Sequence, residues 1–160
     1  MLKRPIGGDN RSFAPLEGPA VRRFYVSVTN AAGVEKGLEG LKILVVDDSK
    51  TIRRTAETLL AKQGCEVFTA VDGFDALAKI ADHKPDLIFV DIMMPRLDGY
   101  QTCSLIKHNK MFKETPVIML SSKDGLFDRA RGRLVGSEQY LTKPFTKDEL
   151  LGAIQSHINR

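Results

Sequence analysis

The sequence predicts an α/β protein built on a doubly wound, five-stranded parallel sheet. From Leu41 onward, short β-branched runs alternate five times with longer amphipathic segments, which is the pattern of βα units on a parallel sheet. In addition, two apolar runs end abruptly in carboxylates, at Asp47-Asp48 and at Asp91. Ligand sites of open α/β folds lie at the carboxyl ends of the strands. We therefore expect one domain with an acidic site at that edge of the sheet.

Length and composition are typical of one soluble globular domain with a tail, because the 160 residues are 42% hydrophobic and 28% charged. No apolar stretch approaches the ~20 residues needed to cross a bilayer, and no signal-peptide segment is apparent. We therefore expect a cytoplasmic protein without membrane insertion. Residues 1–40 carry six Lys/Arg against four Asp/Glu, and residues 41–160 carry eighteen against sixteen. This even distribution of charge argues against direct DNA binding.

The N-terminal part differs from the rest of the chain. Residues 1–40 contain six of the thirteen glycines and three of the seven prolines, with no sustained periodicity. Such a segment is predicted to be a flexible, disordered extension. The domain itself is expected at residues 41–160.

The strands and the first two helices follow from the apolar pattern. Five short apolar runs predict strands at residues 42–46, 66–70, 86–90, 116–120 and 138–142. The first helix has an apolar face at helical spacing, formed by Ile52, Ala56, Leu59 and Leu60. The second helix is expected to open at Asp72 as its N-cap and to bury Leu77, Ile80 and Ala81.

The last three helices are indicated by different signals. The third is expected after Asp98-Gly99, with Leu105 and Ile106 as apolar markers. The apolar residues predicted for the fourth are Leu126, Ala130 and Leu134. The fifth begins at Thr146, with Glu149 three residues later as a capping box. Its predicted buried residues are Leu150, Ala153, Ile154 and Ile158.

The acids should converge if the sheet has the strand order 2-1-3-4-5, because the first and third strands are then neighbours. Asp47, Asp48 and Asp91 would share one crevice. Each carboxylate raises the pKa of its neighbours, so a hard divalent cation with oxygen ligands is the natural counterpart. Lys143 at the end of the last strand, before Pro144, and Ser121 at the end of the fourth strand are placed at the same edge. The Lys143-Pro144 bond can be cis or trans.

Together these residues resemble the receiver domains of CheY-like two-component response regulators, which have a flavodoxin-like fold. The resemblance extends from Leu41 to about Ile158. The matching motifs are Asp47-Asp48, Asp91 followed by Met94-Pro95 and Asp98-Gly99, Ser121, Tyr140 and Lys143-Pro144. The stretches DDSKTIRRTAETLL and FVDIMMPRLDGYQTC are similar in particular to regulators of type IV pilus twitching motility.

The resemblance implies a role for each of these residues. Asp91 would be the phosphoacceptor, and Lys143 and Ser121 would contact the phosphoryl group. Mg²⁺ would be held by Asp47, Asp48, Asp91 and the backbone carbonyl of Met93. Ser121 and Tyr140 would form the conformational switch.

The function implied is that of a single-domain signalling protein which catalyses only its own phosphorylation and dephosphorylation. Its expected phosphodonor is a chemotaxis-type histidine kinase or that kinase's phosphotransfer domain. Phosphorylation would alter a face formed by the fourth helix, the fifth strand and the fifth helix. That face would bind a downstream protein of the pilus machinery or of a signalling pathway.

Three other functions were weighed against this one. An aspartate-nucleophile phosphohydrolase would want a second acid two residues after Asp91, where the chain has Met93. A flavin-binding electron carrier is disfavoured because the chain has no Trp and only three Tyr. A pseudo-receiver, which binds partners without being phosphorylated, stays open as an alternative.

Overall fold

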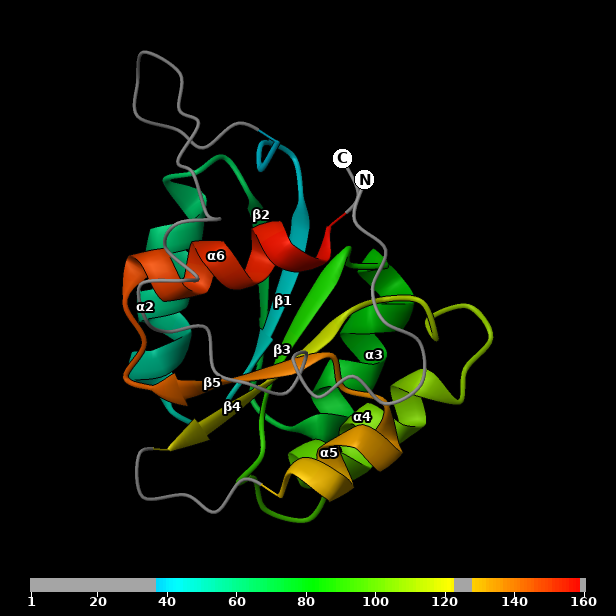
Figure 1. The fold of residues 1–160 in the computed structure, drawn as a ribbon. Helices are drawn as coiled ribbons and strands as arrows, with labels where there is room; N and C mark the ends of the chain where they lie inside the picture. The colour runs from blue at the N-terminus through cyan, green and yellow to red at the C-terminus, as the bar shows by residue number, and fades with distance from the viewer. Residues whose placement is uncertain (1–36, 123–127, 159–160) are drawn as a thin grey trace.

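The computed structural model describes residues 37–122 and 128–158, so residues 1–36 of the predicted extension lie outside the described part. Five parallel strands form one sheet in the order β2-β1-β3-β4-β5 (Figure 1). The strands are β1 (Lys42–Val46), β2 (Glu66–Ala70), β3 (Leu87–Asp91), β4 (Val117–Ser122) and β5 (Gln139–Lys143). This confirms the predicted fold class and strand order, with the last three strands beginning one residue later than expected.

The helices lie on both faces of the sheet, as a doubly wound fold requires (Figure 1). One face is covered by α2 (Lys50–Ala61) and α6 (Lys147–His157). On the other face lie α3 (Gly73–His83), α4 (Gly99–Lys107) and α5 (Arg129–Val135). The chain therefore has two hydrophobic cores, one on each side of the sheet.

Each strand supplies both cores, because successive side chains point to opposite faces. In β3, for example, Leu87 and Phe89 pack toward α2 and α6, whereas Ile88 and Val90 pack toward α3 and α4. All five residues of β3 are buried. A strand buried on both faces explains the continuous apolar runs in the sequence.

Helix starts agree well with the sequence. Asp72 is the N-cap of α3 and accepts a hydrogen bond from the Asp75 backbone N–H at 2.8 Å. Thr146 and Glu149 form the predicted capping box of α6. These starts are predictable because a cap is a local interaction between residues three positions apart.

The apolar face predicted for the fourth helix is wrong. α5 begins only at Arg129, Ala130 is exposed, and the side chain of Leu134 is 85% exposed, while Leu126 lies outside the described residues. The buried residue of α5 is Gly132. A helical residue two positions further along points about 200° away, so the packing of Gly132 turns Leu134 toward solvent.

Three smaller differences also concern burial. Ala81 in α3 and Leu105 in α4 are exposed rather than buried. Leu38, which precedes the predicted domain start at residue 41, is fully buried in the core beneath α2 and α6. The packed core thus includes a residue that the composition of residues 1–40 assigned to the extension.

Candidate functional site

Asp47 directly follows β1 and is completely buried. Its backbone N–H still donates to the Ala70 carbonyl, which continues the pairing with β2 at 3.1 Å. Its side-chain Oδ1 accepts from the Ser49 backbone N–H at 2.8 Å, and its carbonyl accepts from the Arg53 guanidinium at 2.6 Å. The side chain is therefore held in one orientation, while the next residue, Asp48, is exposed.

Asp91 is the last residue of β3 and is only 2% exposed. Because β3 pairs with β1 in the register Val46↔Val90, the residues after these two lie next to each other at the strand ends. The Met93 backbone N–H donates to Asp91 Oδ1 at 3.1 Å. Carboxylate oxygens of Asp47, Asp48 and Asp91 all lie within 4.8 Å of one another. The predicted convergence of the three acids is confirmed.

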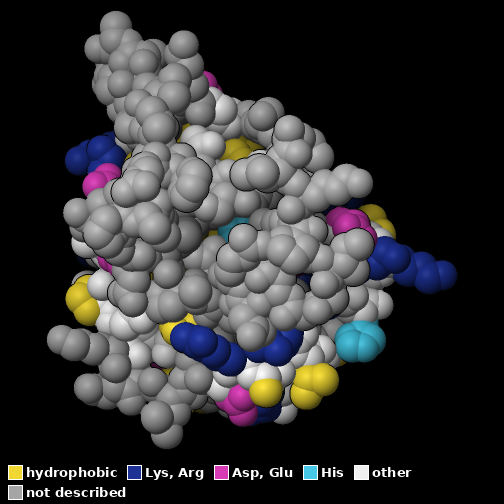
Figure 2. Space-filling view, in the orientation of Figure 1, with side chains coloured by type: hydrophobic (Ala, Val, Ile, Leu, Met, Phe, Trp, Pro, Cys, Tyr) yellow, Lys and Arg dark blue, Asp and Glu magenta, His cyan; other side chains and the backbone are white. Residues whose placement is uncertain are grey.

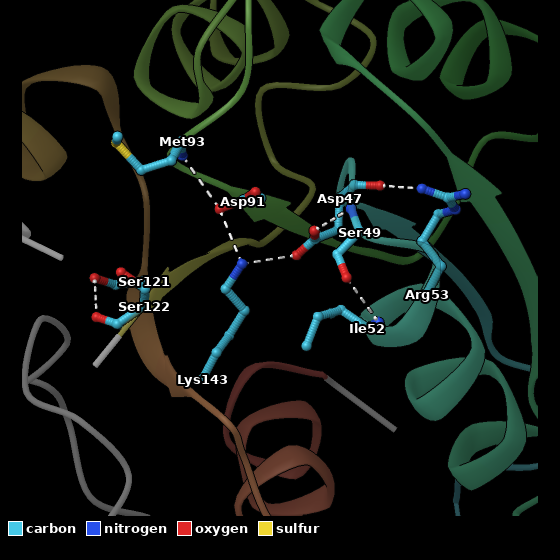
Figure 3. Close-up of polar contacts among 9 residues, drawn as sticks. All are labelled: Asp47, Ser49, Ile52, Arg53, Asp91, Met93, Ser121, Ser122 and Lys143. Atoms are coloured by element: carbon cyan, nitrogen blue, oxygen red, sulfur yellow. Dashed lines mark hydrogen bonds and ion pairs between the residues drawn. The ribbon is translucent and has the colours of Figure 1, made fainter. Parts of the chain in front are cut away.

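Lys143, at the end of β5, reaches across the sheet edge to this cluster (Figure 3). Its Nζ lies 3.0 Å from Asp47 Oδ2 and 3.2 Å from Asp91 Oδ1. The Lys143-Pro144 peptide bond is cis. Burial favours a lower pKa for Lys143, but the hydrogen bonds and charges of Asp47 and Asp91 outweigh it and raise the pKa. The ammonium therefore remains charged and bridges the two buried acids.

The electrostatic balance of the cluster shows that negative charge is in excess. Burial is the main cause that raises the pKa of Asp91 from 3.8 to about 6, with the charge of Asp47 adding to it. Lys143 and the Met93 N–H act in the opposite direction but do not cancel these effects. Three carboxylates face one ammonium, and oxygen donors of this kind suit a hard divalent cation. The residues present therefore fit a metal such as Mg²⁺.

Ser121 and Tyr140 lie on the neighbouring strands β4 and β5. Ser121 is buried, and its hydroxyl donates to the Ser122 carbonyl at 3.3 Å (Figure 3). Tyr140 is partly buried and packs against the core beneath α3 and α4. The Met93 side chain is 69% exposed. The roles of Ser121, Tyr140 and the Met93 carbonyl stay predictions.

Gly99 is a positioning residue whose importance the sequence reasoning missed. A Cβ at this position would lie 2.5 Å from the Asp91 carbonyl oxygen and 2.6 Å from the Ile92 Cα. The Gly99 N–H also donates to the Ile92 carbonyl at 3.1 Å. Helix α4 thus starts directly against the backbone of Asp91 and Ile92. The Asp98-Gly99 pair was visible in the sequence, but the contact that demands glycine was not.

Comparison with known proteins identifies the class. Residues 43–155 match the response regulator receiver domain. The chain belongs to this family.

Individual relatives refine the comparison. The chain is 75% identical over 125 residues to protein PilG of Pseudomonas aeruginosa, covering 78% of this chain and 93% of PilG. It is 40% identical to the alkaline phosphatase synthesis transcriptional regulatory protein PhoP of Bacillus subtilis, covering 74% of this chain but 49% of PhoP. Among solved structures, chemotaxis protein CheY4 of Vibrio cholerae superposes with a TM-score of 0.71 at 34% identity, covering 74% of this chain and 99% of CheY4. The protein is thus a PilG-type, CheY-like receiver.

In the described ranges, no helix is both long enough and apolar enough to cross a membrane.

Proposed function

We propose that this protein is a response regulator that accepts a phosphoryl group on Asp91 and signals by changing the partners it binds. The observation that carries the proposal is the position of the Asp91 carboxylate, which lies 3.2 Å from the Lys143 ammonium and in one cluster with the carboxylates of Asp47 and Asp48. A buried carboxylate that contacts an ammonium and belongs to an acidic cluster suited to a metal ion is well placed for phosphoryl transfer, in which positioning and electrostatics dominate.

In the proposed reaction, a carboxylate oxygen of Asp91 attacks the phosphorus atom of a phosphohistidine. A P–O bond forms, the P–N bond breaks, and the leaving imidazole takes up a proton. The phosphodonor would be a chemotaxis-type histidine kinase or its phosphotransfer domain. Lys143 would exchange its ion pair with Asp91 for contacts to the phosphoryl oxygens, aided by the Ser121 hydroxyl. Its bond to Asp47 would keep the ammonium in place.

Mg²⁺ would be held by Asp47, Asp48 and Asp91, with the Met93 backbone carbonyl as a further ligand. When bound, the ion would offset the negative charge of the entering phosphoryl group. Asp48 is the exposed member of the cluster, whereas Asp47 and Asp91 are buried, so we expect the Asp48 carboxylate to stay in contact with water and Asp47 to orient Lys143.

The response would pass through Ser121 and Tyr140 to the face formed by α5, β5 and α6. Ser121 would turn toward the phosphoryl group, and Tyr140 would move inward into the vacated space. The partner would be a pilus-machinery or signalling protein, which this protein would bind in the cytoplasm. The process controlled would be type IV pilus twitching motility. This assignment is supported by the similarity to PilG. The protein would be a switch and not a turnover enzyme.

The test supplies Mg²⁺ and acetyl phosphate to the full chain and measures its mass. The expected result is an acid-stable, base-labile adduct of about one phosphoryl group that is absent from Asp91→Asn and from reactions containing EDTA. Asp48→Asn should slow adduct formation, because one ligand oxygen is lost. If wild type stays unmodified, even with a cognate kinase, the protein is a pseudo-receiver. Sustained phosphate release from varied phosphomonoesters would instead indicate a phosphohydrolase.

A further inference from the structure

A groove of about 420 Å³ runs between α4 and α5, and none of its lining residues belongs to β5 or α6. It is lined mainly by apolar side chains, together with polar groups from α4 and Arg131. The lining residues used below are Leu97, Tyr100, Leu105, Arg131 and Val135. Leu105 is 49% exposed, although apolar side chains of this size are usually buried. The groove therefore exposes apolar surface to solvent.

The groove continues toward the phosphorylation site. A second hollow is lined by Ile92, Met93, Met94, Pro95, Asp98, Tyr100 and Arg131. The two hollows share Tyr100 and Arg131, so together they extend from the loop after Asp91 to Leu105. A ligand lying along them would contact both the loop that follows the phosphoacceptor and the two helices beyond it.

Arg131 is the cationic group of this surface, and it is held in a fixed orientation. Its guanidinium stacks over the Tyr100 ring at 4.4 Å and lies 3.5 Å from Asp98 Oδ2. The Tyr100 hydroxyl in turn accepts a hydrogen bond from the Asp128 backbone N–H at 2.8 Å. A guanidinium has five N–H donors, and among the described residues Arg131 has one ion pair, to Asp98, so donors are left for a further carboxylate. Stacking lowers the entropy lost when that carboxylate binds.

The charge around the groove favours an acidic ligand. Arg129, Arg131 and Arg133 are all exposed on α5. The two nearest acids serve as helix caps, because Asp98 accepts from the Gln101 N–H and Asp128 accepts from the Arg131 N–H. Figure 2 shows dark blue and yellow side chains close together near the lower edge, in the region of α5, with a magenta acidic group beside them. Apolar surface flanked by arginines is complementary to an acidic, amphipathic segment.

Charge does not favour the chain's own residues 1–36 as the occupant. Residues 1–36 contain six Lys/Arg and three Asp/Glu. They therefore have the same sign of charge as α5 and would be repelled by it. The occupant favoured by charge is a segment of another protein.

We infer that the groove between α4 and α5 docks an acidic amphipathic helix of a partner protein, with its apolar side chains against Leu105 and Val135 and a carboxylate on Arg131. This inference rests on the proposed function, since it names the chemistry of the partner that a receiver would bind. It also adds a second surface, distinct from the face formed by α5, β5 and α6. Gly99 allows the start of α4 to contact the backbone of Asp91. Because α4 also forms one wall of the groove, this helix connects the groove to the phosphoacceptor.

The test uses a phage library of random 16-residue peptides, selected on the full chain in Mg²⁺ and acetyl phosphate. Selected peptides should carry apolar residues at helical spacing flanked by Asp or Glu. Arg131→Glu should weaken their binding about tenfold or more. The matched control is Arg54→Glu, the same charge reversal on exposed α2 at the other face of the sheet, which should change affinity less than about twofold. Leu105→Ser should also weaken binding, without altering Arg131.

Several results would overturn the inference. Peptides lacking acids, or peptides that bind Arg131→Glu and Leu105→Ser as well as wild type, would contradict it. A concentration-dependent dimer that is detected by sedimentation and is lost in Arg131→Glu would also contradict it, because the occupant would then be a second copy of the chain. The Asp91 adduct assay on each variant keeps the two proposals separate. If the adduct forms normally but the groove substitutions do not change peptide binding, this inference alone is contradicted. If wild type forms no adduct, the proposed function is contradicted.

Discussion

Strand β3, which ends at the proposed phosphoacceptor Asp91, and helix α5, which supplies Arg131 to the neighbouring hollow, are packed very differently. Every residue of β3 is buried, and Asp91 at its end is fixed by Met93 and Lys143. Of the seven residues in α5, Gly132 alone is buried. Local stability depends on buried apolar contacts. The proposed phosphoacceptor thus belongs to a fully buried strand, whereas α5, part of the proposed response face, has few buried contacts and should move at lower cost.

The largest expected effect is the difference between two leucine substitutions, one in a buried strand and one in the exposed helix α5. Leu120 in β4 is 1% exposed, and Leu120→Ala should lower the free energy of unfolding by about 3 kcal/mol, because it leaves a cavity. Leu134→Ala in α5 should change it by no more than about 0.5 kcal/mol. Urea denaturation of both variants measures the difference. Equal losses would mean that α5 is packed as firmly as the sheet.

A second variant tests the contact between α4 and the reactive strand. Gly99→Ala should lower the free energy of unfolding by about 2–3 kcal/mol, because the new Cβ would collide with the backbone of Asp91 and Ile92. Helix propensity alone predicts the opposite sign, since alanine is the better helix former. Leu105→Ala, at an exposed position of the same helix, is the control and should be nearly neutral. An unchanged Gly99→Ala stability would show that α4 is free to shift.

The third prediction concerns pH, measured in EDTA so that no metal is bound. The folded pKa of Asp91 is raised from 3.8 to about 6, so its stabilising contribution is complete below pH about 4 and is lost as the pH rises through 6. Asp91→Asn should therefore be more stable than wild type by on the order of 2 kcal/mol above pH 7, with the gap narrowing at acid pH.

Denaturation curves at pH 4 and pH 7.5 test this dependence. Asp48→Asn is the matched control and should have a smaller effect, because water already solvates that exposed carboxylate. Added Mg²⁺ should stabilise wild type more than Asp91→Asn, since the variant lacks one charged ligand. If the difference in free energy of unfolding between Asp91→Asn and wild type is the same at both pH values, burial does not destabilise the ionised form of Asp91.

The smallest expected effect is that of Tyr100→Phe, which removes the hydroxyl that accepts from the Asp128 N–H. The loss should be about 0.5–1 kcal/mol, because water can reach the exposed N-cap of α5. Hydrogen exchange should become faster for α5 amides while those of β3 keep their protection. Equal acceleration in both elements would mean that α5 does not open separately from the sheet.

The sequence analysis succeeded where the determinants were local. The apolar run of β1, the N-cap Asp72 and the capping box at Thr146 each depend on residues a few positions apart, and each is observed. The acidic cluster was also predictable, because the ends of neighbouring parallel strands meet at one edge. For α5, the apolar spacing was misleading, since Gly132 and not Leu134 sets the packed side.

By itself, the amino-acid sequence determined the alternation of strands and helices, the family, and the placing of three acids at strand ends. Only the tertiary structure decided that Lys143 bridges Asp47 and Asp91, since Lys143 and Asp47 are 96 positions apart. It likewise decided that Gly99 touches the reactive strand and that α4 and α5 enclose a groove lined by Arg131. The physical reason is that periodicity and caps report short-range interactions, whereas close contacts between distant segments depend on how the packed elements meet.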